Sequence, residues 1–345
     1  MIRKNTMILL ILLLCILLFS CKTVQEKEVN STKPTIRPSI EASLETSTEP
    51  KATESQTQIA TKEVLAASPA KSPTVKPTVT PTPKSTNRPT MKPLKTPTPN
   101  NRGAYGVFLS VMPGETDRIY NYDTVVIDAQ YFSKKDINKL HNNGQKVYTY
   151  LNVGSIENFR SYYKEYESLT LSAYENWEEE RWIDVSSKKW QTFILEKAKE
   201  LKEKGVDGFF IDNCDVFYVH KKKEIFNGLC SIMEQIRKMK VSVVINGGDT
   251  FVKEYLSRYQ NLSKIMTGAN QETVFSSIDF KYKTFGKASE EDHTYYENYI
   301  NTCAKNGIKV YLLEYTKDPT LRKKIIEYCN KKGYEYYISI SIELE

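Results

Sequence analysis

Residues 22–102 contain no aromatic residue and no glycine, although they hold 12 of the 14 prolines in this chain of 345 residues. A segment rich in Pro, Thr, Ser, Lys and Glu cannot bury enough apolar surface to offset the entropy that folding costs. Proline and charged residues also favour extended conformations. We therefore expect a disordered Pro/Thr/Ser/Lys-rich linker at 22–102, followed by one folded domain at 103–345.

Residues suited to holding a metal ion are scarce. The sequence has three histidines, which lie far apart at His141, His220 and His293, and it has no C-x-x-C pair. A zinc site needs three or four convergent ligands at suitable spacing, so we expect neither a metal nor a cofactor. The sequence leaves open whether Cys303 and Cys329, on successive predicted helices, form the disulfide that an exported domain could contain.

Long apolar runs are also missing. The longest, Met7–Phe19, follows Arg3 and Lys4 and is shorter than the roughly 20 residues of a bilayer-spanning helix. A basic start, a short apolar stretch and a small residue at its end are typical of an export signal. The end of this run, Leu18-Phe19-Ser20-Cys21, resembles a bacterial lipobox, in which the signal is cut before an acylated cysteine. We expect a lipoprotein signal at 1–21 with Cys21 as the lipid anchor, which would hold the domain on the extracytoplasmic face of the cell membrane. An ordinary signal with an incidental cysteine is the alternative.

The excess of positive charge lies outside the domain. The chain has 49 Lys and Arg against 42 Asp and Glu, a net charge of +7, but residues 103–345 hold 34 basic and 35 acidic residues. The basic balance therefore belongs to the leader and the linker. It gives no support for nucleic-acid binding by the domain.

Residues 103–345 alternate between short apolar strands and helices. Eight β-branched or aromatic runs follow one another, and most are continuously apolar, which is typical of parallel strands covered on both faces. The length is close to the roughly 250 residues of a (β/α)8 TIM barrel, which eight strands favour over a doubly wound open α/β sheet. The expected strands are Gly106–Val111, Thr124–Asp128, Lys146–Val153, Gly208–Asp212, Val241–Gly247, Lys264–Gly268, Lys309–Tyr315 and Tyr334–Ser341. The expected helices are Ser133–Asn143, Ser187–Lys204, Glu224–Met239, Phe251–Gln260, Glu290–Asn306 and Pro319–Lys332.

The connection between the third and fourth predicted strands is unusually long. Its surplus, roughly 155–185, holds seven aromatic residues. A long insertion on this side of a barrel usually builds the wall or the lid of the active site. Aromatic faces in that position can stack on sugar rings, but we expect most of the seven to form a small core beneath the insertion.

Polar residues gather at the carboxyl ends of the predicted strands, where the chemistry of such barrels is located. The fourth strand, within Gly205-Val-Asp-Gly-Phe-Phe-Ile-Asp-Asn-Cys-Asp215, ends at Asp212, and Asp215 lies on the loop above it. Asp207 opens the same strand at the opposite end and is interpreted as structural. Two carboxyls flanking a scissile bond are the minimum for most glycoside hydrolysis. The polar residues at the strand ends are Asp128, Asn152, Asp212, Asp215, Asn246, Glu272, Glu314 and Tyr315.

Several motifs, in order, resemble glycoside hydrolase family 114. They are Tyr150-Leu-Asn-Val-Gly154, Glu157-Asn-Phe-Arg160, Trp182-Ile-Asp-Val185 with Trp190, Gly205-x-Asp-Gly-Phe-Phe-Ile-Asp-x-x-Asp215, Ile245-Asn-Gly247 and Asn270-Gln-Glu272. That family contains endo-α-1,4-polygalactosaminidases on a (β/α)8 barrel. The resemblance implies that Asp212 is the nucleophile or base and that Glu272 is the proton donor. It also implies a sugar subsite lined by Asp128, Asn152, Arg160, Asp215, Asn246 and Tyr315, to which we add Glu314 from the end of the seventh strand. Ser155 departs from the pattern, because family members often carry an acidic residue there.

The resemblance implies a substrate polymer of α-1,4-linked galactosamine, partly N-acetylated. A deacetylated amino sugar is cationic, which suits an acid-lined cleft rich in Tyr and Trp. We therefore expect a monomeric, extracytoplasmic endo-glycosidase with a polysaccharide partner. Two alternatives stay open: a glycosidase for another α-linked surface glycan, and a non-catalytic barrel that binds polysaccharide. The sequence fixes neither retention nor inversion of the anomeric centre.

Overall fold

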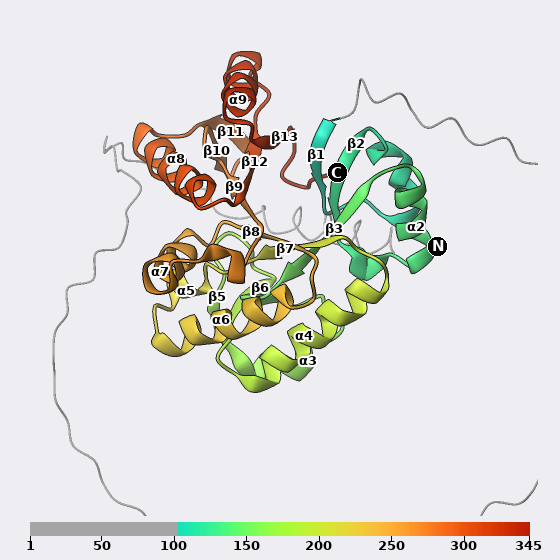
Figure 1. Cartoon of the computed structure of the whole chain (residues 1–345), viewed down its shortest axis with the longest axis vertical. Coiled ribbons are helices and arrows are strands. Elements are labelled where there is room, and N and C mark those ends of the chain that lie inside the picture. Colours follow the sequence, from blue (N-terminus) through green and yellow to red (C-terminus); the bar gives the residue numbers. More distant parts are fainter. Residues whose placement is uncertain (1–102) are drawn as a thin grey trace, which may run out of the picture. The chain divides into compact units, whose positions relative to one another are not determined.

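The computed structural model describes residues 103–345, which form a parallel barrel of eight strands with helices around it (Figure 1). Neighbouring strands pair in the order β1, β2, β3, β7, β8, β9, β12, β13, and β13 packs beside β1, so the ring is nearly closed. The predicted (β/α)8 architecture is confirmed. The strands are β1 Gly103–Phe108, β2 Tyr122–Ile127, β3 Lys146–Asn152, β7 Gly208–Asp212, β8 Ser242–Asn246, β9 Gly268–Glu272, β12 Lys309–Tyr315 and β13 Glu335–Ser339.

The helices lie close to their predicted positions. Ser133 and Asp136 form a reciprocal capping box at the start of the first of them, and Gly333, with φ +70°, ends the last. Figure 1 shows these helices on the outside of the strands. They are α2 Lys134–Asn142, α4 Lys188–Glu203, α6 Lys223–Arg237, α7 Asp249–Tyr259, α8 Glu290–Lys305 and α9 Pro319–Lys332.

The predicted signal at 1–21, its anchor residue Cys21 and the linker at 22–102 lie outside the described residues and stay predictions. No helix in residues 103–345 combines the length and the apolar character that crossing a bilayer requires. The four cysteines of this region are buried free thiols, so Cys303 and Cys329 are not joined in the structure.

The barrel interior is packed with tyrosine. Five tyrosines and Phe210 make up most of the cluster inside the strands, whereas the layer between strands and helices is mainly aliphatic. A tyrosine fills space with its ring and still offers a hydroxyl to a polar neighbour. The interior can therefore support polar side chains at one end. The interior cluster is Tyr105, Val107, Val126, Tyr148, Tyr150, Phe210, Val244, Tyr311, Leu313, Tyr315 and Leu344.

The sixth strand lies four residues later than predicted. Residues Leu262–Lys264 form a 3-10 turn, and β9 runs from Gly268 to Glu272. The sequence Gly-Ala-Asn-Gln-Glu carries no β-branched or aromatic residue, so strand propensity does not reveal it. As a result, Glu272 is the last residue of a barrel strand rather than part of the following loop.

Two excursions leave the barrel at the carboxyl end of its strands. The first excursion (155–185) carries the antiparallel sheet of β4 Ser155–Glu157, β6 Glu180–Ile183 and β5 Thr170–Ala173, together with α3 Tyr163–Tyr166. The second excursion (276–287) is the hairpin of β10 Ser276–Asp279 and β11 Thr284–Lys287, which the sequence pattern did not reveal. Both excursions contribute residues to the cavity described below.

The aromatic residues of the first excursion divide into two groups. Tyr162 and Tyr166 pack their rings against Phe193 of α4, and Trp182 is buried beneath Tyr174 at a ring distance of 4.3 Å. These rings form the expected small core. Phe159 and Trp177 instead remain 60% and 40% exposed and line the cavity.

Candidate active site

Three neighbouring strands turn sharply immediately after a polar residue. Asp212, Asn246 and Glu272 end β7, β8 and β9, and the next residue in each case (Asn213, Gly247 or Thr273) has a φ between 54° and 64°. The left-handed conformation is uncommon for residues other than glycine and is strained for a β-branched threonine. The turns leave the three polar side chains at the carboxyl rim of the barrel.

One amide joins the two predicted catalytic carboxyls. Asn246 Nδ2 donates to Asp212 Oδ1 at 3.0 Å and to Glu272 Oε1 at 2.7 Å. The two acceptor oxygens can therefore be no more than about 5.7 Å apart, the sum of these distances. Side chains from β7 and β9 that were predicted to meet do so through Asn246.

A chain of hydrogen bonds holds that amide in place. Asn270 Nδ2 donates to Asn246 Oδ1 at 2.7 Å, and Tyr105 donates through its hydroxyl to Asn270 Oδ1 at 3.2 Å. Since the oxygen of Asn246 is occupied, its nitrogen must face the carboxyls. The Tyr315 hydroxyl donates to Glu272 Oε2 at 2.7 Å, so both oxygens of Glu272 have a partner.

Both carboxyls have raised pKa values. Burial raises the pKa of Asp212 to about 8, the nearby Glu272 adds to the shift, and the bond from Asn246 opposes it. Burial also raises the pKa of Glu272, against the bonds from Asn246 and Tyr315. Two close, partly buried carboxyls resist simultaneous ionisation, so the pair retains a proton near neutral pH. One ionised and one protonated carboxyl is the state that glycoside hydrolysis requires.

Asp215 lies beside the pair and is fixed by the next loop. Its Oδ2 accepts from the backbone N–H of Gly248 at 3.0 Å, and a Cβ at Gly247 would lie 3.0 Å from the same oxygen. Burial raises the pKa of Asp215 to about 7, with the Asp249 carboxylate as the next cause. Asp215 therefore adds a third titrating carboxyl to the same wall of the cavity.

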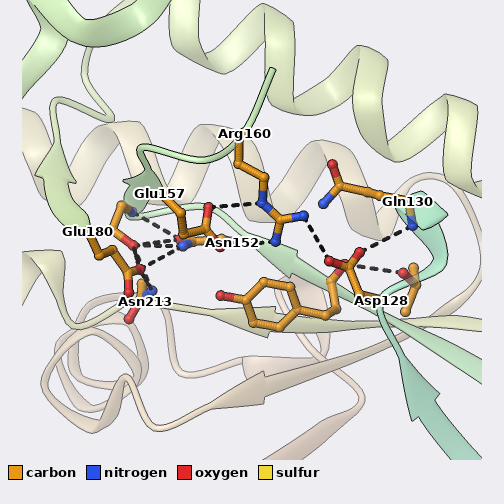
Figure 2. Close-up of polar contacts among 10 residues, drawn as sticks. Asp128, Gln130, Asn152, Glu157, Arg160, Glu180 and Asn213 are labelled. Atoms are coloured by element: carbon orange, nitrogen blue, oxygen red, sulfur yellow. Dashed lines mark hydrogen bonds and ion pairs between the residues drawn. The ribbon is translucent and has the colours of Figure 1, made fainter. Parts of the chain in front are cut away.

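A buried arginine links the second strand to the first excursion (Figure 2). Arg160 donates to Asp128 Oδ2 at 2.8 Å and to Glu157 Oε1 at 3.1 Å, and the three side chains are 7–9% exposed. Burial opposes the charge of the guanidinium, but Glu157 and Asp128 together hold the pKa of Arg160 above its usual value. Asp128 and Arg160, both predicted from the sequence, therefore line the cavity together, and Glu157 is an addition.

Asn152 lies behind the cavity wall rather than in it. Its Nδ2 donates to Glu180 Oε1 at 2.9 Å, and Asn213 Nδ2 donates to the same oxygen at 2.9 Å. The hydroxyl of Ser155 also donates to this oxygen. Glu180 lines the cavity from β6, and burial raises its pKa. Figure 2 shows the hydrogen bonds that join Asn152 and Asn213 to Glu180. Glu180 was missed because it ends a run of three glutamates that has no periodic pattern.

Glu314 does not reach the cavity. Its carboxylate is fully buried on the other side of β12, where it accepts from the backbone N–H groups of Phe275 and Ser276 and from the Ser276 hydroxyl. Successive residues of a strand face opposite sides, so Glu314 and Tyr315 cannot both point into the barrel. The prediction that Glu314 binds substrate is therefore wrong, because this carboxylate supports the base of the second excursion.

The cavity above these residues has a volume of about 840 Å³. Its lining contains eight carboxyl side chains against one guanidinium, that of Arg160, and no lysine or histidine. A concave wall of low dielectric constant, lined by charges of one sign, concentrates its electric field on a bound ligand. The cavity is therefore suited to a cation. The eight carboxyl side chains of the lining are those of Asp128, Glu157, Glu180, Asp212, Asp215, Glu272, Asp292 and Glu343.

Within residues 103–345, no group of three or more His, Cys, Asp or Glu side chains is arranged to hold a metal ion. The polar groups of the cavity are instead engaged with amides, hydroxyls and one guanidinium.

Comparisons with known proteins agree with this fold. Two solved structures share the fold: the glycoside hydrolase domain of PelA from Pseudomonas aeruginosa (TM-score 0.59, 17% identity, 70% of this chain and 95% of that chain) and Aspergillus fumigatus Ega3 in complex with galactosamine (TM-score 0.54, 15% identity, 72% of this chain and 94% of that chain). A search of the curated proteins gave no match. The model of glycoside-hydrolase family GH114 matches residues 85–343. The chain therefore belongs to glycoside-hydrolase family GH114 and is a glycoside hydrolase.

Proposed function

We propose that this glycoside hydrolase cleaves internal bonds of an α-1,4-linked galactosamine polymer, partly N-acetylated, with Asp212 and Glu272 as its catalytic carboxyls. The observation that carries the proposal is the contact of both carboxyls with the single amide of Asn246 at the floor of the cavity. The structural neighbour Ega3 was solved with galactosamine, which supports the substrate class.

The charge of the cavity supports an amino sugar that is at least partly deacetylated. Eight carboxyls face one guanidinium in its lining, and a protonated amino sugar carries one positive charge per residue. Attraction between the polymer and the cavity is screened by salt. KM for the polymer should therefore rise with ionic strength, and full N-acetylation of the polymer should remove most of that dependence.

The spacing of the two carboxyls favours retention of the anomeric configuration. Retaining glycosidases hold their carboxyls about 5–5.5 Å apart, and inverting ones about 6.5–9.5 Å. The upper limit of about 5.7 Å between the bridged oxygens of Asp212 and Glu272 agrees with the shorter separation. In the proposed reaction Asp212 bonds to the anomeric carbon while the proton of Glu272 passes to the leaving oxygen. Water then releases the sugar from Asp212 and returns a proton to Glu272.

The substrate itself has a role in preparing this state. In the free protein Glu272 accepts from two donors and Asp212 from one, which places the shared proton preferentially on Asp212. A sugar ammonium bound beside Asp212 favours its ionised form and leaves the proton on Glu272. A cationic substrate would thus convert the pair to the form that the reaction needs, whereas an N-acetylated sugar would not.

The proposal places the enzyme outside the cytoplasm, anchored by Cys21 and held away from the membrane by the linker at 22–102. Its basis is the apolar run Met7–Phe19 that ends at Ser20-Cys21. Labelling of the expressed full chain with a fatty acid should mark the wild type and not Cys21→Ala. Equal labelling of both would overturn the anchor assignment.

The direct test is hydrolysis of galactosamine polymer by Asp212→Asn, Glu272→Gln and a control, Asp207→Asn. Asp207 directly precedes the same strand, at the opposite end of the barrel, where it contacts His141 and the N–H of Val147. We expect each active-site variant to lose at least about 1,000-fold in kcat and the control to stay within about threefold of wild type. Wild-type turnover by either active-site variant would refute the catalytic assignment.

A panel of defined glycans separates the proposed substrate from its alternatives. Cleavage of another α-linked polymer in preference to galactosamine polymer would overturn the substrate. Tight binding without cleavage of any glycan would instead indicate a carbohydrate-binding barrel. Early release of products of many lengths, rather than single sugars, would identify endo action.

A further inference from the structure

The two excursions rise from nearly opposite sides of the barrel mouth. The first follows β3, the third strand of the ring, and the second lies between β9 and β12, the sixth and seventh. Asp212 and Glu272 come from the fourth and sixth strands, so they lie between the two bases. A contact between the tips of the excursions would therefore pass above the carboxyl pair.

Each excursion is firmly attached at its base. Glu180 of the first accepts bonds from Asn152 and Asn213 of the barrel. In the second, the buried Glu314 accepts from Ser276, and Ser276 Oγ in turn accepts from the N–H of Tyr315 at 3.0 Å. Buried charge-assisted bonds of this kind are strong. The bases are therefore fixed, and any movement is confined to the tips.

The tips meet through two aromatic rings. Trp177, between β5 and β6, and Phe280, between β10 and β11, lie 6.2 Å apart in an edge-to-face arrangement. Both rings line the same cavity as Asp212 and Glu272, although they remain 40% and 37% exposed. A single exposed ring pair is a weak contact compared with the bonds at the two bases.

We propose that Trp177 and Phe280 form an openable roof over the active site that controls how the polymer enters. This inference rests on the proposed function, in which the substrate is a polysaccharide. It adds how that polysaccharide enters the active site. With the rings in contact, a sugar chain reaches the carboxyls only by threading one end beneath them. With the rings apart, an internal stretch of polymer can enter from above, and the two ring faces then stack on its sugars. Mid-chain cleavage therefore depends on opening of this pair.

The first experiment locks the roof with a covalent bridge. In the full chain, Trp177→Cys and Phe280→Cys are combined and joined with a short bismaleimide. The four cysteines of residues 103–345 are buried, which favours selective reaction at the two new sites. The two single variants and the wild type, treated with the same reagent, control for modification elsewhere.

The locked enzyme should cleave short galactosamine oligosaccharides within about threefold of its unlocked form. It should cleave polymer at least about tenfold more slowly, with short products released from chain ends. An unchanged polymer rate with unchanged product lengths in the locked enzyme would overturn the roof.

The second experiment needs no substrate. The chain has three tryptophans, of which Trp182 and Trp190 are 6% and 1% exposed, so Trp177 dominates the fluorescence that acrylamide can quench. Phe280→Ala should raise the quenching constant by about twofold, since it uncovers one edge of the indole. Trp177→Phe, as the control, should remove the quenchable component. Equal quenching of Phe280→Ala and wild type would show that the rings do not cover each other.

The two experiments distinguish a failure of the roof from a failure of the proposed function. If the wild type cleaves no galactosamine polymer, the proposed function fails and the role of the roof in polymer entry fails with it. The fluorescence result then still decides whether the ring pair exists. If the wild type cleaves the polymer and the locked enzyme does so equally well, the roof alone is wrong.

Discussion

The Tyr315 hydroxyl donates a 2.7 Å hydrogen bond to Glu272 Oε2, the oxygen that Asn246 does not contact. Tyr315 ends β12 and Glu272 ends β9, which are neighbours in the barrel. The two donors fix the orientation of the carboxyl and favour its ionised form. Tyr315 is therefore placed to set the pH at which Glu272 can act as an acid.

Tyr315→Phe should move the pH–rate profile to higher pH. Loss of one donor to the carboxylate raises the pKa of Glu272 further, so the two apparent pKa values of kcat/KM should rise by about one pH unit in total. We expect kcat/KM at the wild-type optimum to fall about tenfold, with partial recovery at higher pH. An unshifted profile would show that this bond does not tune the pair.

Asp212→Asn should stabilise the folded protein while abolishing catalysis. Burial raises the pKa of Asp212 to about 8, above its value in the unfolded chain. A group with a raised folded-state pKa contributes stability that is complete below about pH 4 and is lost as the pH rises to about 8. Asn does not ionise, so Asp212→Asn does not lose this stability as the pH rises. The gain, followed by denaturant unfolding, should be near zero at pH 4 and on the order of 2 kcal/mol at pH 8, since water screens part of the effect. A constant difference across this range would contradict the pKa assignment.

Arg160→Met should destabilise the domain. The substitution leaves Asp128 and Glu157 buried without their cation, which costs about 3–5 kcal/mol. Arg160→Lys keeps the charge but loses the forked bonds and should cost less. Chemical unfolding of both variants measures the difference. A loss below about 1 kcal/mol for Arg160→Met would show that the two acids are protonated or solvated instead.

Glu314→Ala should destabilise the second excursion and leave the catalytic rate nearly unchanged. Two backbone N–H groups, of Phe275 and Ser276, lose their acceptor, which costs about 2–3 kcal/mol. We expect kcat on short oligosaccharides to stay within about threefold of wild type, because Glu314 lies outside the cavity. A loss of kcat as large as that of Glu272→Gln would restore Glu314 as a catalytic candidate.

The strand–helix alternation of the barrel was predictable because most of its strands are continuously apolar and its helices have clear ends. β7, β12 and α9 have the predicted boundaries. β9 was misplaced because its Asn270 is buried through pairing with the amide of Asn246, which no local propensity records. The hairpin of the second excursion was missed because its short strands are half-exposed and depend on Glu314.

The residues of the site were predictable where they end a recognisable strand, as Asp212 and Asn246 do. The prediction failed at Glu314 because Glu314 and Tyr315 were both assigned to the cavity. They are consecutive residues of one strand, so their side chains point to opposite faces. The Glu180 cluster could not be found from the sequence, because Asn152, Ser155, Glu180 and Asn213 meet only through the fold of the first excursion.

Rescue by azide tests the central claim that Asp212 and Glu272 act as nucleophile and proton donor on one glycosidic bond. The substrate is an aryl glycoside of a galactosamine oligosaccharide, and the variants are Asp212→Ala and Glu272→Ala. We expect azide to restore turnover of Asp212→Ala with a glycosyl azide of inverted configuration, and that of Glu272→Ala with a product of retained configuration. Wild-type activity of either alanine variant without azide would contradict the account.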